Sequence, residues 1–400
     1  MMEVSEALGR VLALAGPVRT EWVALSQADG RALAAPAVAQ LTQPPFDASA
    51  MDGYAIRRAD GGQALRVIGE SAAGHPWRGS AQPGTAIRIF TGAPLPPGYD
   101  CVVMQEHVAR EGDVIRLHTQ SERDNIRPRG NDFAQGDQIA PGRLLTAADI
   151  GLLAAMNLPQ VQVAARPHVH VLAGGDELIR PGQVPGEGQI ISSNDLAIAA
   201  LARQAGAEAT ILPIARDTEA SLREGLARAA QGDLIVTIGG ASVGDHDLVN
   251  SVAADLGLER AFYKLALRPG KPLIAGRIRD AAMLGLPGNP VSALVCSILF
   301  MQPLIRRMQG LPPGPFPRRA RLACDLPQEG DRQHYQRARL LPGQDLPRIE
   351  PFSDQDSARL MLMARADALL IRPAHDPARK AGEMVEFLPL RPEALTESSS

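Results

Sequence analysis

Two stretches that lie far apart in the chain combine acidic side chains with glycine-bearing turns. The first, Ser49-Ala-Met-Asp-Gly-Tyr-Ala55, places the carboxylate of Asp52 in a tight turn. The second, from Gly239 to Asp247, reads Gly-Gly-Ala-Ser-Val-Gly-Asp-His-Asp and follows an apolar strand pattern. Backbone amides at a glycine-rich strand-to-helix junction bind phosphate, and carboxylates hold hydrated divalent cations. The two stretches together indicate a phosphate-handling enzyme.

Taken alone, each stretch has an ordinary explanation. The segment after Gly239 is equally well read as a plain strand–turn–helix junction with acidic caps. The turns at Asp52, Thr91 and Asp132 are common loop sequences, and chance alone favours that interpretation for them.

A second junction, Met283 to Pro290, has the same character. Asn289 suits the N-cap of a helix and Pro290 its first position, and an apolar stripe follows. Pro303 is expected to end or kink this helix. Good capping explains Asn289 fully but leaves Gly288 less well explained.

Between the two junctions lies a basic segment, Lys264-Leu-Ala-Leu-Arg-Pro-Gly-Lys271. If 261–267 is a strand, Lys264 and Arg268 project from one face near its end. Scattered basic residues are usually solvated surface, but two anion-binding loops flank this cluster. The pattern favours a site for several phosphates.

The surrounding elements bring these residues together. From 168 to 310, strands at 168–173, 209–214, 233–238 and 272–278 alternate with helices, which predicts a doubly wound, mostly parallel sheet. Ligands bind at the carboxyl edge of such sheets. Four loops at that edge carry Glu177, Asp217, Asp247 and the Lys264/Arg268 pair. Because these loops converge, the set is more specific than any member.

Four domains are expected in this α/β chain. An N-terminal mixed helical domain comprises 1–36 and 141–166, with helical character at 4–12 and again from Trp22 to Leu33. A β-rich domain of short strands is inserted at 37–140. The doubly wound domain covers 167–312, and a C-terminal β-barrel covers 318–393 after a proline-rich linker.

Composition narrows the class of protein. The 400 residues carry a formal charge of −3, which argues against nucleic acid as a partner. No apolar run approaches the roughly 18 residues of a membrane span, and the N-terminus does not resemble a signal peptide. Three separated cysteines predict buried thiols rather than disulfides or a zinc site. A cytoplasmic enzyme is expected.

The ordered motifs resemble those of a known family. Pro45-x-x-x-Ser49-x-Met-Asp-Gly-Tyr-Ala55, Thr91-Gly-Ala-Pro94, Gly174-Gly-Asp-Glu177, Gly239-Gly-x-Ser-Val-Gly244, Arg268-Pro-Gly-Lys-Pro272 and Leu286-Pro-Gly-Asn-Pro-Val-Ser292 are similar to those of the MoeA family of molybdopterin molybdenumtransferases. The resemblance covers nearly the whole chain. This family also includes the E domains of plant Cnx1 and of gephyrin.

The resemblance implies ligation of molybdate into adenylylated molybdopterin with release of AMP, in a reaction dependent on Mg²⁺. It also implies an elongated homodimer, whose cleft lies between the sheet domain of one subunit and the β-rich domain of the other, and association with other proteins of cofactor biosynthesis. The catalytic positions that it implies are Asp52, Thr91, Asp132, Glu177, Asp217, Asp247, Lys264 and Arg268, with Asp217 and Asp247 as metal ligands. The cofactor-binding positions are Gly239, Gly240, Ser242, Gly244, Pro287, Gly288, Asn289, Arg337 and Ser357.

The chain departs from the family pattern at two places. Arg268 stands where the family often has lysine; arginine keeps the charge and binds anions in a bidentate way. Ala173-Gly174-Gly175 replaces a more common Ser/Thr-Gly and removes a hydroxyl.

Two other functions remain open. The adenylyltransferase that precedes this step has a related sheet domain, but it carries a Gly-Thr-Gly loop and lacks the β-rich domain. A gephyrin-like scaffold without catalysis is the second, although no long linker joins another module here.

Overall fold

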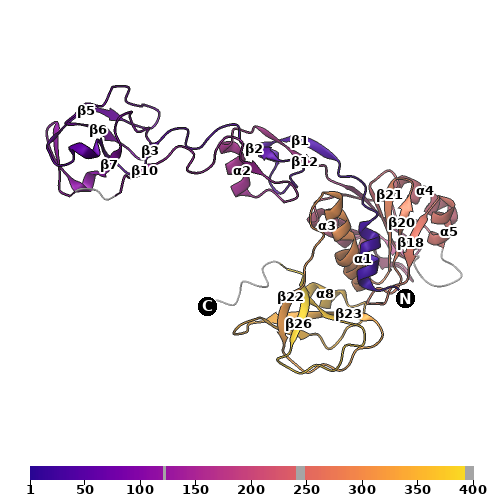
Figure 1. Cartoon of the computed structure of the whole chain (residues 1–400). Coiled ribbons are helices and arrows are strands. Elements are labelled where there is room, and N and C mark those ends of the chain that lie inside the picture. The colour runs from indigo at the N-terminus through magenta and orange to yellow at the C-terminus, as the bar shows by residue number, and fades with distance from the viewer. Residues whose placement is uncertain (120–122, 240–247, 392–400) are drawn as a thin grey trace. The chain divides into compact units, whose positions relative to one another are not determined.

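The computed structural model describes residues 1–119, 123–239 and 248–391, and the chain forms two compact units (Figure 1). Unit 1 comprises Met1–Glu21 and the chain from Ala164 onward, and unit 2 comprises Trp22–Val163. The chain therefore begins in unit 1, leaves it to form unit 2, and returns. The finer division into four domains stays a prediction.

The largest element of unit 1 is a mixed sheet. Its strands follow the order β16 (Glu208–Ile211), β13 (His168–Ala173), β17 (Leu234–Ile238), β21 (Ala281–Leu286), β20 (Ile274–Ile278) and β18 (Glu259–Tyr263). The first four are parallel, and β20 and β18 add antiparallel strands at one edge. This confirms the expected doubly wound, mostly parallel sheet.

Helices cover both faces of this sheet. One face carries α1 (Val4–Leu12), α3 (Asn194–Gln204), α6 (Pro290–Cys296) and α7 (Gln302–Met308), and the other carries α4 (Glu219–Ala229) and α5 (Leu248–Asp255). Strand β17, Leu-Ile-Val-Thr-Ile, is consequently buried at every residue. A nearly continuous apolar run is what a parallel strand covered on both faces requires.

The helix that begins at Pro290 does not end at Pro303. A π-helical segment, Ser297–Met301, interrupts the α-helical hydrogen bonding, and α7 begins again with Pro303 in its first turn. Within the described residues, one helical stretch, Pro290–Met308, is long and apolar enough to cross a membrane. It is 72% buried inside the protein, so it packs as a core helix.

The expected strand 261–267 is wrong. Strand β18 ends at Tyr263, and Lys264 adopts a left-handed φ of 77° that turns the chain away from the sheet. Leu267–Arg268 then forms β19, which pairs with β23 (Gln333–Leu341) of the C-terminal region. Lys264 and Arg268 therefore do not share a face of one strand.

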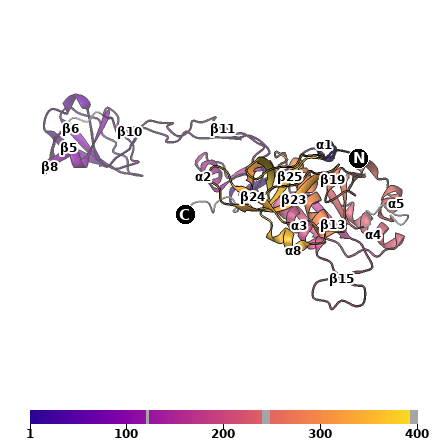
Figure 2. The same ribbon diagram turned by 90° about the horizontal axis from the view of Figure 1, so that it is seen from below.

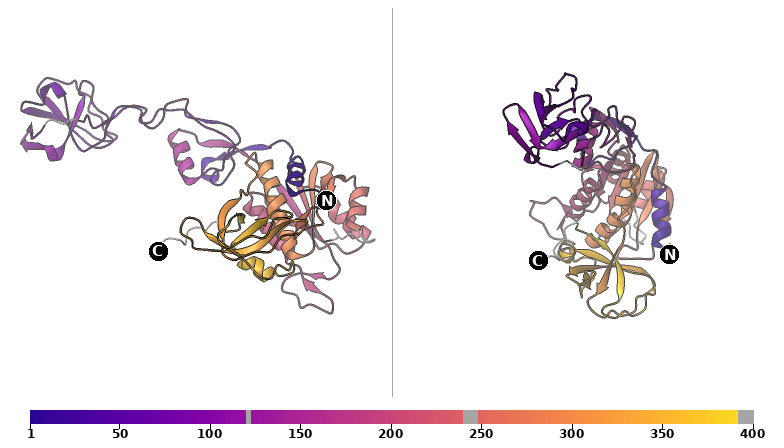
Figure 3. Two further views of the ribbon diagram at one scale, coloured as in Figure 1. Left: turned by 60° about the horizontal axis from the view of Figure 1, so that its bottom comes forward. Right: turned by 60° about the vertical axis from the view of Figure 1, so that its left-hand side comes forward.

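The C-terminal region of unit 1 is a closed barrel (Figure 3). Strand β23 pairs with β24 (Arg348–Pro351), β24 with β22 (Arg318–Leu322), β22 with β26 (Met384–Pro389), β26 with β25 (Ala368–Arg372), and β25 again with β23. Helix α8 (Leu360–Arg365) lies between β24 and β25 in the chain. The expected C-terminal barrel is confirmed.

Unit 2 contains a six-stranded sheet of order β7 (Cys101–Met104), β4 (Gly53–Ile56), β6 (Thr85–Ile89), β5 (Leu65–Ser71), β9 (Val114–Leu117) and β8 (Val108–Glu111). Three two-stranded ladders join β3 (Ala48–Ser49) to β10 (Ile126–Arg127), β2 (Ala37–Val38) to β11 (Gln138–Ile139), and β1 (Thr20–Ala24) to β12 (Gln160–Ala164). Helix α2 (Ala147–Ala155) begins with a capping box between Thr146 and Asp149.

Two further expectations are corrected. The stretch from Trp22 to Leu33 is not helical, because β1 and a short 3₁₀ turn, Leu25–Gln27, occupy its first half. The cysteines are free, and Cys101 and Cys296 are buried, but Cys324 is only partly buried.

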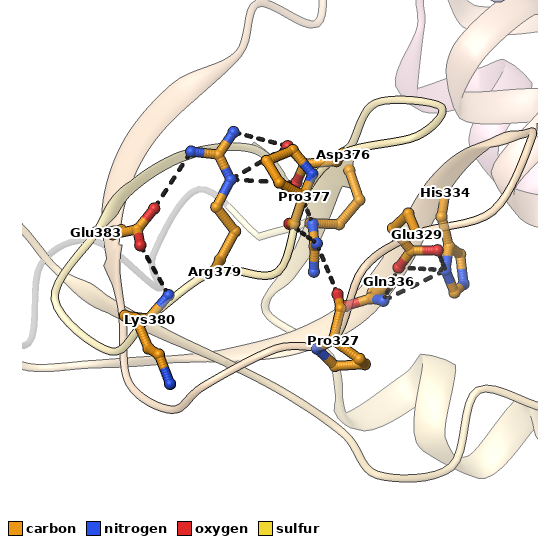
Figure 4. A network of polar contacts seen from close by, with 10 residues as sticks. Pro327, Glu329, His334, Gln336, Asp376, Pro377, Arg379, Lys380 and Glu383 are labelled. Carbon is orange, nitrogen blue, oxygen red and sulfur yellow. Dashed lines mark hydrogen bonds and ion pairs between the residues drawn. The ribbon is translucent and has the colours of Figure 1, made fainter.

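A polar network occupies one end of the barrel (Figure 4). Arg372 is 1% exposed, and its guanidinium pairs with the buried carboxylate of Asp376, which also accepts hydrogen bonds from Arg379. Burial opposes ionisation of Asp376, but the Arg379 and Arg372 hydrogen bonds hold the pKa of its carboxyl below the usual range. A charged network thus replaces apolar packing here.

The same end holds a buried imidazole. His334 Nδ1 lies 3.2 Å from Glu329 Oε1, and Gln336 donates to the same carboxylate oxygen at 2.7 Å. Burial lowers the pKa of His334 despite the neighbouring Glu329. The neutral imidazole is therefore favoured in the folded protein.

Neutralising Asp376 is expected to destabilise unit 1. The D376N variant leaves two guanidinium groups without their carboxylate, one of them buried, so the free energy of unfolding should fall by about 3–5 kcal/mol. The matched control is D345N, which breaks the ion pair of Arg321 with an Asp345 side chain that is 57% exposed, and it should cost less than about 1 kcal/mol. Urea unfolding followed by circular dichroism measures both; equal losses would contradict the network's role.

Candidate functional site

A pocket of about 770 Å³ lies at the carboxyl edge of the doubly wound sheet. It is bounded by the ends of four parallel strands, where the topology predicts a ligand site. The structure brings together six of the residues singled out by the sequence, all of which line it: Glu177, Asp217, Gly239, Pro287, Gly288 and Asn289.

Closely packed glycine backbones make the floor of the pocket. A Cβ on Gly239 would lie 3.1 Å from the carbonyl oxygen of Gly174, and Gly239 has a φ of 85° that favours glycine. A Cβ on Gly288 would in turn reach the Cα of Gly239 at 3.8 Å. Neighbouring strand ends therefore approach one another without side chains between them.

Acidic residues form one side of the pocket. The Glu177 carboxylate folds over Gly175, where an added Cβ would lie 2.3 Å from Glu177 Oε2. The Asp217 side chain accepts from the Asp176 amide at 3.4 Å, and the Asp176 side chain accepts from the Asp217 amide at 3.3 Å. This reciprocal pair holds the loops after β13 and β16 together at the pocket.

Asn289 joins the pocket to the barrel. It occupies the N-cap position of α6, but its side chain does not cap the helix; its amide donates to Ser357 Oγ at 3.0 Å. The carbonyl of Ser357 accepts from the Val291 amide at 3.1 Å. The preceding residue, Gly288, is also held: its carbonyl accepts a hydrogen bond from the side-chain amide of Asn194 at 2.7 Å.

Arg337 supports the Ser357 segment from inside unit 1. It is 1% exposed, and its guanidinium donates to the Gln355 side chain at 3.2 Å and the Asp356 carbonyl at 2.8 Å. These bonds fix the backbone that presents Ser357 to Asn289. A direct contact between Arg337 and a cofactor stays a prediction.

The basic residues lie on the loop that leads to the pocket. Lys264 Nζ sits 5.4 Å from the centre of the Tyr263 ring, and Arg268 is exposed in β19. Neither lines the pocket among the described residues, although Pro272 of the same loop does. The convergence of both cations on the acids stays a prediction.

Gly270 anchors this loop. It has a φ of 116°, and an added Cβ would lie 2.5 Å from Cys296 Sγ. Burial raises the pKa of the Cys296 thiol to about 12, so this cysteine is a packing residue and no nucleophile.

An arm that the sequence did not predict borders the pocket. Strand β14 (Leu178–Ile179) pairs in parallel with β15 (Ile190–Ile191), and the chain between them extends from the body of unit 1 (Figure 2). Ile190 of this arm lines the pocket. Two-residue strands separated by proline and glycine give too weak a pattern to find from sequence.

In unit 2, Asp52 and Thr91 form a hydrogen-bonded pair. Asp52 Oδ1 accepts from the Thr91 amide at 2.8 Å and from its hydroxyl at 2.9 Å. The bond from the Thr91 amide, and to a smaller extent the bond from its hydroxyl, lowers the pKa of Asp52 and keeps the carboxylate ionised. Asp132 is exposed in another turn, where its amide donates to the Gln43 carbonyl at 3.1 Å.

Part of the predicted site lies outside the described residues, namely Gly240, Ser242, Gly244 and Asp247. Over the described ranges, no three His, Cys, Asp or Glu side chains gather as a metal site. Asp217 and Glu177 line the same pocket with carboxylate oxygens, the donors that Mg²⁺ prefers. Their chemistry therefore fits a magnesium ion completed by other oxygens.

Family models match three consecutive parts of the chain. The N-terminal region of MoeA, domains I and II, matches residues 2–157; a probable molybdopterin binding domain matches 170–307; and the C-terminal region of MoeA, domain IV, matches 319–390. The pocket lies in the second of these.

The chain belongs to the MoeA family. A molybdopterin molybdenumtransferase of Nostoc sp. is 37% identical over 93% of this chain and 89% of its own length. One from Haemophilus influenzae is also 37% identical, over 78% of each chain. A crystal structure of the MoeA protein of Pyrococcus horikoshii OT3 has a TM-score of 0.83 at 27% identity and covers 97% of this chain and 100% of its own.

The close packing of Gly239 against Gly174 predicts that a side chain at position 239 destabilises the protein. The G239A variant combines a left-handed φ with a Cβ against the Gly174 carbonyl. It should lose more than the G182A control, where φ is 92° but nothing lies within 4 Å of the added Cβ. We expect about 1 kcal/mol for G182A and about 2–3 kcal/mol for G239A.

Urea unfolding followed by circular dichroism measures the two losses. Both tryptophans, Trp22 and Trp77, lie in unit 2, so their fluorescence does not report on unit 1. Equal losses in the two variants would show that the close approach at Gly239 is not tight in solution.

Proposed function

We propose that this chain is a molybdopterin molybdenumtransferase that inserts molybdate into adenylylated molybdopterin and releases AMP in a reaction dependent on Mg²⁺. The observation that carries the proposal is the pocket at the carboxyl edge, whose side-chain-free floor and acidic side lie in the region similar to molybdopterin binding domains. Support also comes from relatives that carry this enzyme name.

The pocket residues suit binding of an adenylylated pterin phosphate. Backbone groups near Gly239 and Gly288 allow phosphate oxygens to approach without steric hindrance. Asn289 and Ser357, joined by a hydrogen bond, supply fixed polar groups at the rim. Lys264 and Arg268, on the adjacent loop, would neutralise phosphate and incoming molybdate.

The reaction needs neutralisation of charge rather than a protein nucleophile. Hydrolysis breaks the phosphoanhydride between AMP and the molybdopterin phosphate, with water supplying the oxygen. Mg²⁺, when bound by Asp217 and Asp247, would supply positive charge at this linkage. Glu177 borders the same pocket and would orient the reacting groups.

We further propose a cytoplasmic homodimer in which the second copy completes the site. Asp52, Thr91 and Asp132 belong to unit 2, and the pocket residues belong to unit 1. The Asp52–Thr91 pair presents a carboxylate that its two hydrogen bonds hold in place and keep ionised. Contribution of this carboxylate to a pocket on the other subunit would give it a role.

The first test measures AMP release from adenylylated molybdopterin, with and without molybdate and Mg²⁺. The wild type should release AMP only with both, and D217N should reduce the rate at least tenfold, or about 1.4 kcal/mol. The control D280N changes an acid in the turn before β21, at the opposite edge of the same sheet, and should keep the wild-type rate. Consumption of ATP with metal-free molybdopterin would instead indicate an adenylyltransferase, and peptide binding without AMP release a scaffold.

A second test addresses the shared site. D52A and E177Q, each inactive alone, should recover about one quarter of wild-type activity when co-expressed, because half of the dimers are mixed and each mixed dimer has one intact site. The control pair E177Q and D217N, both in unit 1, should recover nothing. Absence of recovery from D52A with E177Q in a confirmed mixed dimer would refute a site built from two copies.

A further inference from the structure

The hydroxyl of Thr237 is buried without a hydrogen-bond partner among the described residues. Thr237 is the last residue but one of the fully buried strand β17 and is 3% exposed. Its Oγ1 atom is shielded from solvent and forms no hydrogen bond with a described group. Most buried hydroxyl groups in proteins are paired, so an orphan of this kind calls for an explanation.

The position of Thr237 in the sheet places it directly beneath the pocket. Thr237 is in register with Leu172 on β13 and with Gly285 on β21. Two residues further along the chain, just past the end of each strand, stand Gly174, Gly239 and Pro287. These three residues all line the pocket. Thr237 thus belongs to the layer immediately below the pocket floor.

The side of the sheet to which the Thr237 side chain points agrees with a position below the pocket. Ile235, two residues earlier in β17, packs in the same cluster as Leu222 and Val249, and both of these residues also line the pocket. Because side chains alternate along a strand, Thr237 faces the same side as Ile235. No side chain of β17 separates its hydroxyl from the pocket, since Ile238, the last residue of the strand, packs on the opposite side and Gly239 follows it.

The neighbouring strand leaves room for the hydroxyl. An added Cβ on Gly285 would lie 3.3 Å from Thr237 Oγ1 and 3.1 Å from the Cβ of Ile274. Valine would fill the position of Thr237 with the same shape and without the polar atom. A buried hydroxyl with no partner destabilises the free protein, so threonine at this place has to serve something other than packing.

We propose that Thr237 is a substrate-contact residue: its hydroxyl, which the free protein shields from solvent, becomes accessible at the floor of the pocket on binding and donates a hydrogen bond to an oxygen of the ligand. This inference rests on the proposed function of the pocket and adds a contact inside the sheet to it. The hydroxyl has no partner among the described residues of the free protein and becomes paired when the ligand binds. Ligand-free stability and ligand affinity are therefore opposed at this residue.

The test compares T237V with T85V. Thr85 is a buried threonine of unit 2 whose hydroxyl donates to the Gln82 carbonyl at 2.7 Å and lies 2.9 Å from Tyr99 Oη. In the ligand-free protein, T237V should raise the thermal midpoint of unit 1 by about 2 °C, and T85V should lower that of unit 2. Circular dichroism follows both units and tryptophan fluorescence follows unit 2 alone, so the transition of unit 1 is the one that circular dichroism detects and fluorescence does not.

Calorimetric titration then measures binding of AMP and of molybdopterin separately. T237V should weaken binding of one of them about five- to tenfold, and the affected compound identifies which part of the substrate reaches the floor. T237S, which keeps the hydroxyl, should retain the wild-type affinity. T85V should also bind normally.

Two results would overturn the proposal. A lower thermal midpoint for T237V would reveal a partner for the hydroxyl in the free protein, and unchanged affinity for both compounds would show that no ligand oxygen reaches it. Failure of the wild type to bind either compound would instead refute the proposed role of the pocket. The failure of this inference and that of the proposed function are therefore distinguishable.

Discussion

The absence of side chains where parallel strands end is the constraint on which the rest of unit 1 depends. Gly174, Gly239 and Gly288 let three neighbouring loops approach within van der Waals distance of one another's backbones. Any Cβ at Gly239 would meet the Gly174 carbonyl. The pocket is therefore bounded below by main chain, and its polar side chains enter from the sides.

Those side chains are held by contacts between separate parts of unit 1. The barrel contacts two segments that lead to the pocket, Asn289 through its bond with Ser357 and Leu267–Arg268 through the pairing of β19 with β23. Arg337 is buried behind the first of these contacts. The barrel thus acts on the pocket by fixing backbone segments, while the charged network of Arg372, Asp376 and Arg379 serves the barrel's own stability.

Local patterns in the sequence were sufficient for much of this architecture. Strand β13 has the residues expected of it, 168–173, because its apolar residues and flanking breakers define it locally. The glycine junctions at Gly239 and Gly288 were also recognisable, since strand topology alone places them at one edge. The alternation of strands and helices was enough to predict the order of layers.

Contacts between segments far apart in the chain determine the features that local sequence patterns did not predict. Strand β1 was read as helical because its partner β12 lies far along the chain. Lys264 was predicted to lie in a strand because a lysine side chain gives no indication of a left-handed φ. The Asn289 side chain was assigned to capping, yet its partner is Ser357, 68 residues later. Thr237 looked like one more β-branched core residue, because lack of a partner is visible only in three dimensions.

The excursion of the chain out of unit 1 and back has a consequence for biosynthesis. Val4, Ala7 and Val11 of α1 pack in the main core of unit 1, whose other members follow Ala164. At about 5–20 residues per second on the ribosome, this first helix emerges roughly 10–30 s before the strands that cover it. During translation its apolar side is exposed, and unit 2 can complete its folding first. A nascent chain paused near residue 163 would thus still lack every strand that covers this helix in the folded protein.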